Sequence, residues 1–360
     1  MGRILFIGSN VTHYQESIMK GFINNGFDVY SPKYLEYKEV NRLIKFAYKN
    51  IHKRNFIKKQ NTLYFSRLQE VKPDYVFIVN DYFMSTEFLE YCESKGIKIL
   101  GYSLDAIDFC NEAMEGNNIY EHLKYYDAFY SYEPTDTRFI VKNGNNVKYL
   151  PLGFDASFFD RTFHNKSEYK YDIFFAGSLD KNRIEILNQV AKLAYENGYK
   201  MIVHTGIQLK KYNSLLLIPK IFFRQRKFKK HYRYLYDVID NNIIPIDKIS
   251  KLYANSKICI NIYASKCPEQ HTGPNPRTFE TMAAGSLVFI DSGHVESVLE
   301  DAGKYLVEFG NSDDLLRKIS YYMSNEQERL KLASFGFERA WSYYTQDNLV
   351  KQIIDNENII

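Results

Sequence analysis

The stretch that best indicates the fold runs from residue 271 to residue 285 and reads HTGPNPRTFETMAAG. Asn275 is a favourable N-cap, and Pro276 has the fixed φ angle that suits the first position of a helix. Gly285 is a typical residue to end a helix. An apolar run, expected to be a strand, follows at 286–291. The stretch therefore predicts a short helix that leads into a buried strand, as in an α/β domain.

The second half of the chain repeats this alternation on both sides of that stretch. A buried strand at 172–176 runs into the glycine turn Gly177-Ser178, and further strands are expected at 200–204 and 258–262. Such strands, separated by helical segments, predict a parallel sheet covered on both faces. The chain from about residue 325 onward is expected to be mostly helical.

The first half follows the same pattern. Its expected strands are Ile4–Gly8, Tyr75–Val79, Lys98–Tyr102, Ala128–Tyr132 and Val147–Leu150, with helical segments such as Gln15–Asn24 and Thr86–Lys95 between them. We therefore expect two Rossmann-like α/β/α domains facing each other across a cleft. The expected divisions are an N-terminal domain at 1–155, a linker at 156–170, a C-terminal domain at 171–340, and a final helix at 341–360 that packs back toward the N-terminal domain.

Composition narrows the class of protein. The chain has 360 residues, 45% of them hydrophobic and 25% charged, which is typical of a globular protein with room for two domains. No run approaches the roughly 18 apolar residues of a membrane span, and the N-terminus does not read as a signal peptide. Four scattered cysteines without a Cys-x-x-Cys pair favour a reducing compartment and argue against a zinc site. We expect a cytoplasmic protein.

The helix expected at 276–284 offers binding chemistry at its first turn. Free backbone N–H groups and the positive end of the helix dipole suit a diphosphate, and Arg277 adds a guanidinium with bidentate geometry for phosphate. Glu280, one turn on, is placed to accept hydrogen bonds from ribose hydroxyls. The alternative is a surface ion pair between Arg277 and Glu280 on an ordinary capped helix.

Four segments resemble the CgeB-like (spore maturation protein) glycosyltransferases of the GT-B superfamily, over about residues 150–356. That family carries an Arg-x-Phe-Glu-x-x-x-x-Gly segment, a Leu-Pro-x-Gly-x-Asp linker, a Phe-x-Gly-Ser strand end with a nearby arginine, and characteristic final helices. The similar segments here are 277–285, 150–155, 175–178 with Arg183, and 334–339 followed by Tyr344-Thr345.

The resemblance implies a GT-B fold whose C-terminal domain binds a nucleotide-diphosphate-sugar as co-substrate, with UDP-sugar as the default. It implies that Arg277 contacts the diphosphate, that Glu280 contacts the ribose, and that Gly177, Ser178 and Arg183 lie beside the phosphates. Glycine in the turn also lets backbone amides approach an anion closely. The alternative for Arg183 is a solvated residue near a helix start.

The sequence departs from the pattern of related retaining enzymes, which often carry a second glutamate eight positions before Glu280. Thr272 stands there, so the contact with the donor sugar is either missing or taken by His271 or Thr272. The helix cap Asn275 is expected among the residues that bind the co-substrate. No Asp-x-Asp motif occurs anywhere in the chain. We therefore expect no metal and no other cofactor, and a diphosphate stabilised by the helix dipole and arginine.

The N-terminal domain is expected to supply the acceptor site and a general base. Asp105 follows the strand at 98–102 and His13 follows the strand at 4–8, so both are expected at the carboxyl ends of strands, facing the cleft. Either side chain can deprotonate an acceptor hydroxyl. The alternatives are a turn cap for Asp105 and an uninvolved loop residue for His13.

Two basic segments stand out from the rest of the chain. Residues 40–59 combine apolar residues at helical spacing with a lysine-rich face, and residues 210–233 contain nine Lys or Arg and no Asp or Glu. Either segment can contact an anionic membrane, or can be a solvated helix face whose apolar side packs in the core. The chain shows no nucleic-acid motif, so no nucleic-acid partner is expected.

These features predict a metal-independent glycosyltransferase acting on a glycan, lipid-linked or protein acceptor, in bacterial surface polysaccharide biosynthesis. Two alternatives stay open: a nucleotide-sugar epimerase or hydrolase on the same fold, and a non-catalytic module that binds a sugar or nucleotide.

Overall fold

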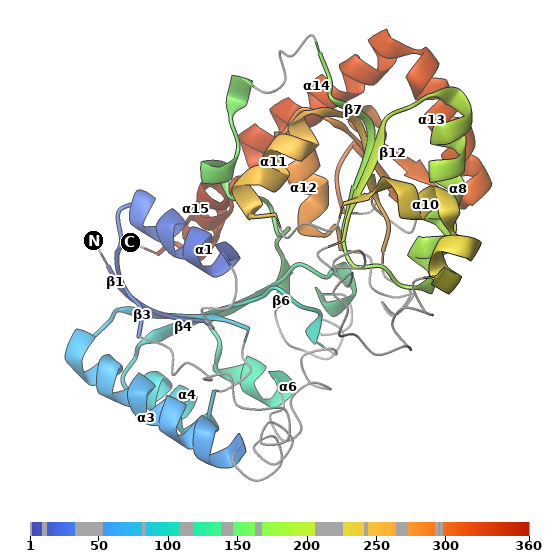
Figure 1. Cartoon of the computed structure of the whole chain (residues 1–360). Helices are drawn as coiled ribbons and strands as arrows, with labels where there is room; N and C mark the ends of the chain where they lie inside the picture. The colour runs from blue at the N-terminus through green and yellow to red at the C-terminus, as the bar shows by residue number, and fades with distance from the viewer. Residues whose placement is uncertain are drawn as a thin grey trace. The chain divides into compact units, whose positions relative to one another are not determined.

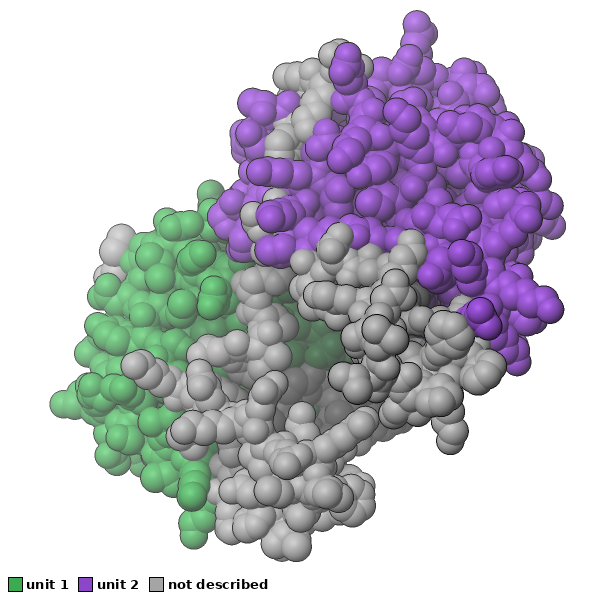
Figure 2. Space-filling view, viewed as in Figure 1, with its two compact units in different colours: residues 1–152, 346–360 green, residues 153–345 purple. Residues whose placement is uncertain are grey.

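The computed structural model describes residues 2–8, 13–32, 53–80, 84–107, 119–137, 147–162, 168–205, 226–240, 244–263, 273–291, 295 and 298–359. The chain forms two compact units, each with its own parallel sheet (Figure 1, Figure 2). Unit 1 comprises Met1–Leu152 and Gln346–Ile360, and unit 2 comprises Gly153–Thr345. The residues at 156–170, expected to be a separate linker, are grouped with unit 2.

Unit 1 is built on a six-stranded sheet in the order β2-β1-β3-β4-β5-β6, with every pair of neighbouring strands parallel. Its strands are β1 (Arg3–Ile7), β2 (Asp28–Tyr30), β3 (Tyr75–Val79), β4 (Lys98–Ser103), β5 (Ala128–Ser131) and β6 (Val147–Tyr149). Its helices include α1 (His13–Asn24), α3 (Lys53–Val71), α4 (Thr86–Ser94), α6 (Ile119–His122) and α15 (Gln346–Glu357). Figure 1 shows α1 and α15 on one face of this sheet and α3 and α4 on the other, so both faces of the apolar strands are covered.

Helix α15 joins the end of the chain to unit 1 by packing on α1. Gly21 of α1 permits close approach, because a Cβ atom there would lie 2.8 Å from Val350 Cγ2. Asn24 Nδ2 donates a hydrogen bond to Asp347 Oδ1 over 3.1 Å. The preceding helix, α14 (Glu326–Tyr343), belongs to unit 2. The chain therefore returns to unit 1 between Thr345 and Gln346.

Unit 2 is built on a second six-stranded sheet, in the order β12-β11-β10-β7-β8-β9, again with all neighbouring strands parallel. Its strands are β7 (Tyr171–Ala176), β8 (Met201–His204), β9 (Ile239–Asp240), β10 (Ser256–Asn261), β11 (Leu287–Asp291) and β12 (Leu306–Phe309). Its helices include α8 (Lys181–Asn197), α10 (Arg233–Val238), α11 (Ile246–Ala254), α12 (Pro276–Ala283), α13 (Ser312–Ser324) and α14.

The alternation of side chains along β7 divides the core of unit 2 into two layers. Ile173 and Phe175 pack with residues of α8 and α13, whereas Phe174 and Ala176 pack with residues of α11 and the end of α12. All four side chains are at most 8% exposed. The result is a helix–sheet–helix arrangement, and the two units confirm the predicted α/β fold class with two Rossmann-like sheets.

This topology brings three strand ends together. Strands β7, β10 and β11 are neighbours and run in the same direction, so their carboxyl ends meet at one edge of the sheet. Ligands of open α/β sheets bind beyond that edge. None of the helices in the described ranges is long and apolar enough to cross a membrane.

Candidate functional site

The first turn of α12 lies at this edge and is capped as the sequence predicts. Asn275 is the N-cap, and its Oδ1 accepts the backbone N–H of Arg277 over 3.1 Å, while Pro276 occupies the first turn. The capping amide also lies 3.4 Å from Arg277 Nε. One side chain therefore both starts the helix and restrains the arginine that follows it.

The side chain of Arg277 reaches across to the end of β7. Its Nη1 donates to the carbonyl oxygen of Ala176 over 2.8 Å. A Cβ atom on Gly177 would lie 2.3 Å from the same nitrogen, so only glycine leaves room for the guanidinium here. The Gly177 N–H in turn donates to the carbonyl of His204 on β8 over 2.9 Å, which holds the turn in place.

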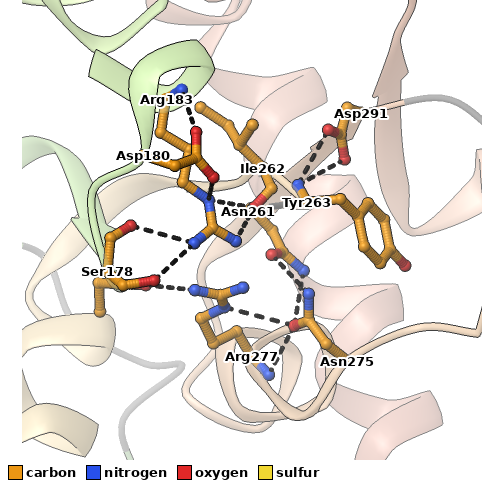
Figure 3. A network of polar contacts seen from close by, with 10 residues as sticks. Ser178, Asp180, Arg183, Asn261, Ile262, Tyr263, Asn275, Arg277 and Asp291 are labelled. Carbon is orange, nitrogen blue, oxygen red and sulfur yellow. Dashed lines mark hydrogen bonds and ion pairs between the residues drawn. The ribbon is translucent and has the colours of Figure 1, made fainter. Parts of the chain in front are cut away.

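Arg183 lies at the start of α8, and only 3% of it is exposed. Its Nη1 donates to both Ser178 O and Ser178 Oγ over 3.0 Å, and its Nε and Nη2 donate to the carbonyl of Ile262 over 3.0 and 2.6 Å. Asp180 caps α8 by accepting the Arg183 N–H over 3.0 Å. The guanidinium thus ties the turn after β7 to the segment after β10 (Figure 3).

An amide pair links β10 to α12. Asn261, at the end of β10 and 1% exposed, donates from Nδ2 to Asn275 Oδ1 over 3.0 Å and accepts from Asn275 Nδ2 over 2.9 Å. Its Nδ2 also donates to Thr278 Oγ1 over 2.9 Å. The bond to Thr278 is buried and the two Asn261–Asn275 bonds are partly buried, and together they leave little freedom for the helix cap.

Asp291, the last residue of β11, adds a carboxylate to the same group. Its two oxygens accept the backbone N–H of Tyr263 over 2.9 and 3.1 Å (Figure 3). Burial raises the pKa of Asp291 to about 6, although the Tyr263 N–H and the charges of Arg183 and Arg277 act in the opposite direction. A carboxylic acid with a pKa near neutrality in such surroundings is a feature of functional sites.

Glu280 lies one turn into α12 and is 6% exposed. It lies near Tyr253 of α11, whose pKa is raised well above its usual value first by burial and then by the charge of Glu280 and a hydrogen bond to it. No ion pair between Glu280 and Arg277 is present among the described residues. The guanidinium of Arg277 instead points to Ala176.

The structure brings together the predicted residues of unit 2, namely Gly177, Ser178, Arg183, Asn275 and Arg277, with Glu280 on the same helix. Two residues that we did not predict, Asn261 and Asp291, complete the network. A signal for them existed, because each is a polar residue at the end of a buried strand expected in the sequence.

The candidate base Asp105 lies in unit 1, two residues after the end of β4. Its Oδ2 lies 3.4 Å from Asn80 Nδ2, and its backbone carbonyl accepts a hydrogen bond from Ser103 Oγ over 2.5 Å. His13 is the first residue of α1. The side chain of His13, the residues His271 and Thr272, and most of the basic segments 40–59 and 210–233 lie outside the described residues.

Comparisons with known proteins agree with this reading of the fold. The family model described as "Glycosyl transferase-like" matches residues 214–355, which include the end of β10, α12 and β11. No curated protein sequence matches the chain significantly.

Solved structures match over the whole chain. Sucrose-phosphate synthase from Thermosynechococcus elongatus has 12% identity and a TM-score of 0.65, covering 99% of this chain and 98% of its own. HepE from Anabaena, in complex with UDP and glucose, has 11% identity and a TM-score of 0.61 with full coverage of both chains. UDP-GlcNAc 2-epimerase from Neisseria meningitidis, bound to UDP-GlcNAc, has 10% identity and a TM-score of 0.60, covering 99% of each chain. The chain therefore has the GT-B fold, and its residues 214–355 are similar to the glycosyl transferase-like family.

Proposed function

We propose that the protein is a glycosyltransferase that moves a sugar from a nucleotide-diphosphate-sugar to a glycan, lipid-linked or protein acceptor. The observation that carries this proposal is the anchoring of Arg277 at the first turn of α12, where its guanidinium crosses the glycine turn after β7. The N–H of Arg277 is taken by the cap Asn275 and that of Thr278 by the Asn275 carbonyl, so the positive end of the helix dipole and the fixed guanidinium form the proposed site for a diphosphate.

The other residues of the network have supporting roles in this proposal. Arg183 donates to main-chain carbonyls after β7 and β10, so we assign it the positioning of the Gly177-Ser178 turn rather than a direct phosphate contact. The Asn261–Asn275 pair fixes the helix cap. Because a preformed site loses less entropy on binding, this rigidity increases the affinity for the diphosphate.

Glu280 is proposed to accept hydrogen bonds from the ribose hydroxyls, and His271 or Thr272 to contact the donor sugar. The Glu280 carboxylate is buried beside Tyr253, which forms a hydrogen bond with it. The ribose hydroxyls therefore compete with the Tyr253 hydroxyl, a weak acid, for this carboxylate. Uridine diphosphate is the proposed nucleotide. The structural neighbour HepE, which holds UDP and glucose, supports this choice.

In the proposed reaction the sugar–phosphate bond breaks, and negative charge develops on the departing diphosphate. The α12 dipole and Arg277 stabilise that charge, so no metal is required. Asp105 or His13 of unit 1 takes the proton from the acceptor hydroxyl. Asn80 lies within reach of the Asp105 carboxylate and can hold its orientation.

The proposed biological setting rests on the sequence. We place the protein among CgeB-like glycosyltransferases of bacterial surface polysaccharide biosynthesis, in the cytoplasm, with the basic segments 40–59 and 210–233 touching the inner face of the membrane. The proposed functional division is an acceptor domain at 1–155 and a donor domain at 171–340.

The direct test is a thermal-shift panel of nucleotides and nucleotide sugars. A specific ligand raises the melting temperature by mass action, and we expect UDP or a UDP-sugar to do so. Arg277→Ala is expected to abolish that shift. Arg317→Ala, which removes an arginine with a 75% exposed side chain on α13, is the matched control and should keep it. A full shift in the Arg277→Ala protein would disprove the donor site.

A second candidate, nucleotide-sugar epimerisation or hydrolysis, is favoured by Asp291. Its raised pKa and the electrostatic influence of Arg183 and Arg277 on it suit an acid–base group in the donor site. Incubation of the bound UDP-sugar without any acceptor, followed by NMR, separates the two reactions. A new epimer or free sugar, lost in Asp291→Asn, would favour the second candidate. An unchanged UDP-sugar that is consumed only with an acceptor would favour transfer.

A further inference from the structure

A hollow on unit 2 lies between the 3₁₀ helix η5 (Ala302–Lys304) and the last turns of α14. Its volume is about 260 Å³. The lining residues are Asp301, Lys304, Tyr305, Phe335, Glu338, Arg339, Ser342 and Tyr343. None of these belongs to the network around Arg277.

Two aromatic rings stand exposed at this hollow. Phe335 is 51% exposed and Tyr343 is 49% exposed, and both lie on α14. They are eight residues apart on a helix, so they share one face and are separated by about 12 Å along the axis. Leaving two large rings half in water is unfavourable for a monomer, and exposed aromatic residues at a concave surface are typical of ligand contacts.

The groups between the rings are held in place by their neighbours. The Arg339 guanidinium lies 4.5 Å from the centre of the Tyr343 ring, and its Nη2 lies 3.3 Å from Glu300 Oε2. Tyr305 is 4% exposed and donates its hydroxyl to the carbonyl of Glu300 over 2.9 Å. The surface is therefore preorganised, which lowers the entropic cost of binding a ligand.

The charges at the hollow balance each other. Lys304 Nζ pairs with Asp301 Oδ2 over 2.9 Å, and the lining carries two acids, Asp301 and Glu338, and two bases, Lys304 and Arg339. A balanced lining gives little net attraction for an anion or a cation. It does offer donors and acceptors of hydrogen bonds on either side of the two rings.

We propose that this hollow is a binding site for a neutral oligosaccharide, separate from the donor site. The apolar faces of sugar rings pack on aromatic side chains, while their hydroxyls bond to carboxylates, ammonium and guanidinium groups at the edges. The spacing of Phe335 and Tyr343 suits a short chain of sugars rather than a single ring. This hollow shares no residue with the proposed donor site, so sugar binding here can be measured separately from donor binding.

The test is saturation-transfer NMR and affinity titration with maltohexaose, cellohexaose, xylohexaose, mannohexaose and N-acetylchitohexaose, with hexagalacturonate as the charged comparison. At least one neutral chain is expected to bind. Phe335→Ala and Tyr343→Ala should each weaken it by roughly 10-fold. Tyr343→Phe, which keeps the ring, should bind nearly as well as the wild type. Leu330→Ala is the matched control, since Leu330 is 40% exposed on the same helix but does not line the hollow.

Several results would overturn the proposal. One is the absence of binding by every neutral chain, and another is equally tight binding of hexagalacturonate. A third is binding that survives Phe335→Ala but is lost in Arg277→Ala, which would place the sugar at the donor site. Self-association that Phe335→Ala abolishes, without any glycan binding, would instead identify a surface for a second copy. UDP-induced thermal shifts in the same variants show separately whether the proposed function holds.

Discussion

Replacing Gly177 by alanine is the sharpest available perturbation of the candidate site, because it adds one methyl group at a known place. The new Cβ would lie 2.3 Å from Arg277 Nη1, and the next contact, with Phe175 Cζ, is at 3.2 Å. The atom in the way is the end of a flexible side chain, so the guanidinium can swing aside, but alanine must also adopt a backbone φ of 158° that residues other than glycine rarely adopt. Gly177→Ala should therefore displace Arg277, with added backbone strain that lowers the melting temperature.

The expected magnitudes follow from the contacts that are lost. The bond from Arg277 Nη1 to the carbonyl of Ala176 disappears, which costs the folded protein about 1–3 kcal/mol. A diphosphate loses the charge-assisted hydrogen bonds of the displaced guanidinium, worth about 1.5–3 kcal/mol. That loss corresponds to a roughly 10- to 150-fold weaker affinity for UDP.

The assay is isothermal titration with UDP on the wild type, Gly177→Ala, Arg277→Ala and the double variant, with the melting temperature of each protein as the folding control. Because alanine at 177 acts through Arg277, it should add little to the loss already caused by Arg277→Ala. UDP affinity within two-fold of the wild type in Gly177→Ala would refute the reasoning. So would a double variant in which the two losses simply add.

Three further outcomes are expected. Asn275→Ala removes the cap of α12 and should lower the free energy of unfolding by about 1 kcal/mol, as measured by chemical denaturation. It should also weaken UDP binding, measured by titration, because the cap restrains Arg277. If both values are unchanged, the assigned role of Asn275 is wrong. Burial raises the pKa of Asp291 from 3.8 to about 6, so the folded state holds more protons than the unfolded state between these values. Stability should therefore fall as pH rises from 3.8 to about 6 and level off at higher pH. Asp291→Asn should remove up to about 3 kcal/mol of this fall, as seen in melting curves from pH 4.5 to 7.5, and an unaltered pH profile would count against it. Burial raises the pKa of Cys92 to about 12 and that of Cys259 further, so neither thiol should react with a thiol reagent in the native protein. Mass spectrometry of the treated protein tests this, and a label on either cysteine would contradict the buried position.

The central strands were predictable because their apolar runs are continuous. The strands expected at 4–8, 75–79 and 258–262 correspond to β1, β3 and β10, which lie inside their sheets and are buried on both faces. The strands that we did not predict are β2, β9 and β12. All three are edge strands of two to four residues. A short edge strand buries few side chains, so its periodic signal is weak and only its pairing partner reveals it.

The residues of the candidate site likewise include some that could be predicted from the sequence and some that could not. Asn275 and Arg277 could be predicted because a helix cap and its first turn are local features, readable from adjacent residues. Asn261 and Asp291 were missed because their partners, Asn275 and Tyr263, lie 14 and 28 positions away. A polar residue at the end of a predicted strand marks each position, but only the order of the strands in the sheet identifies its partner.

Arg183 illustrates how a residue can join the candidate site in a role other than ligand contact. A resemblance places an arginine near the phosphates, and the structure does put Arg183 within the same network. Its guanidinium, however, is only 3% exposed and donates to the carbonyls of Ser178 and Ile262, which lie 5 and 79 positions away. A buried charge is stable only when its donors are satisfied, and these carbonyls satisfy them. The positive charge still opposes the rise in the pKa of Asp291, so Arg183 influences the site electrostatically without having to touch a ligand. Arg183 can thus hold the turn in place and contribute its charge to the site, while Arg277, half-buried and anchored at its cap, is the residue that we propose to contact the diphosphate.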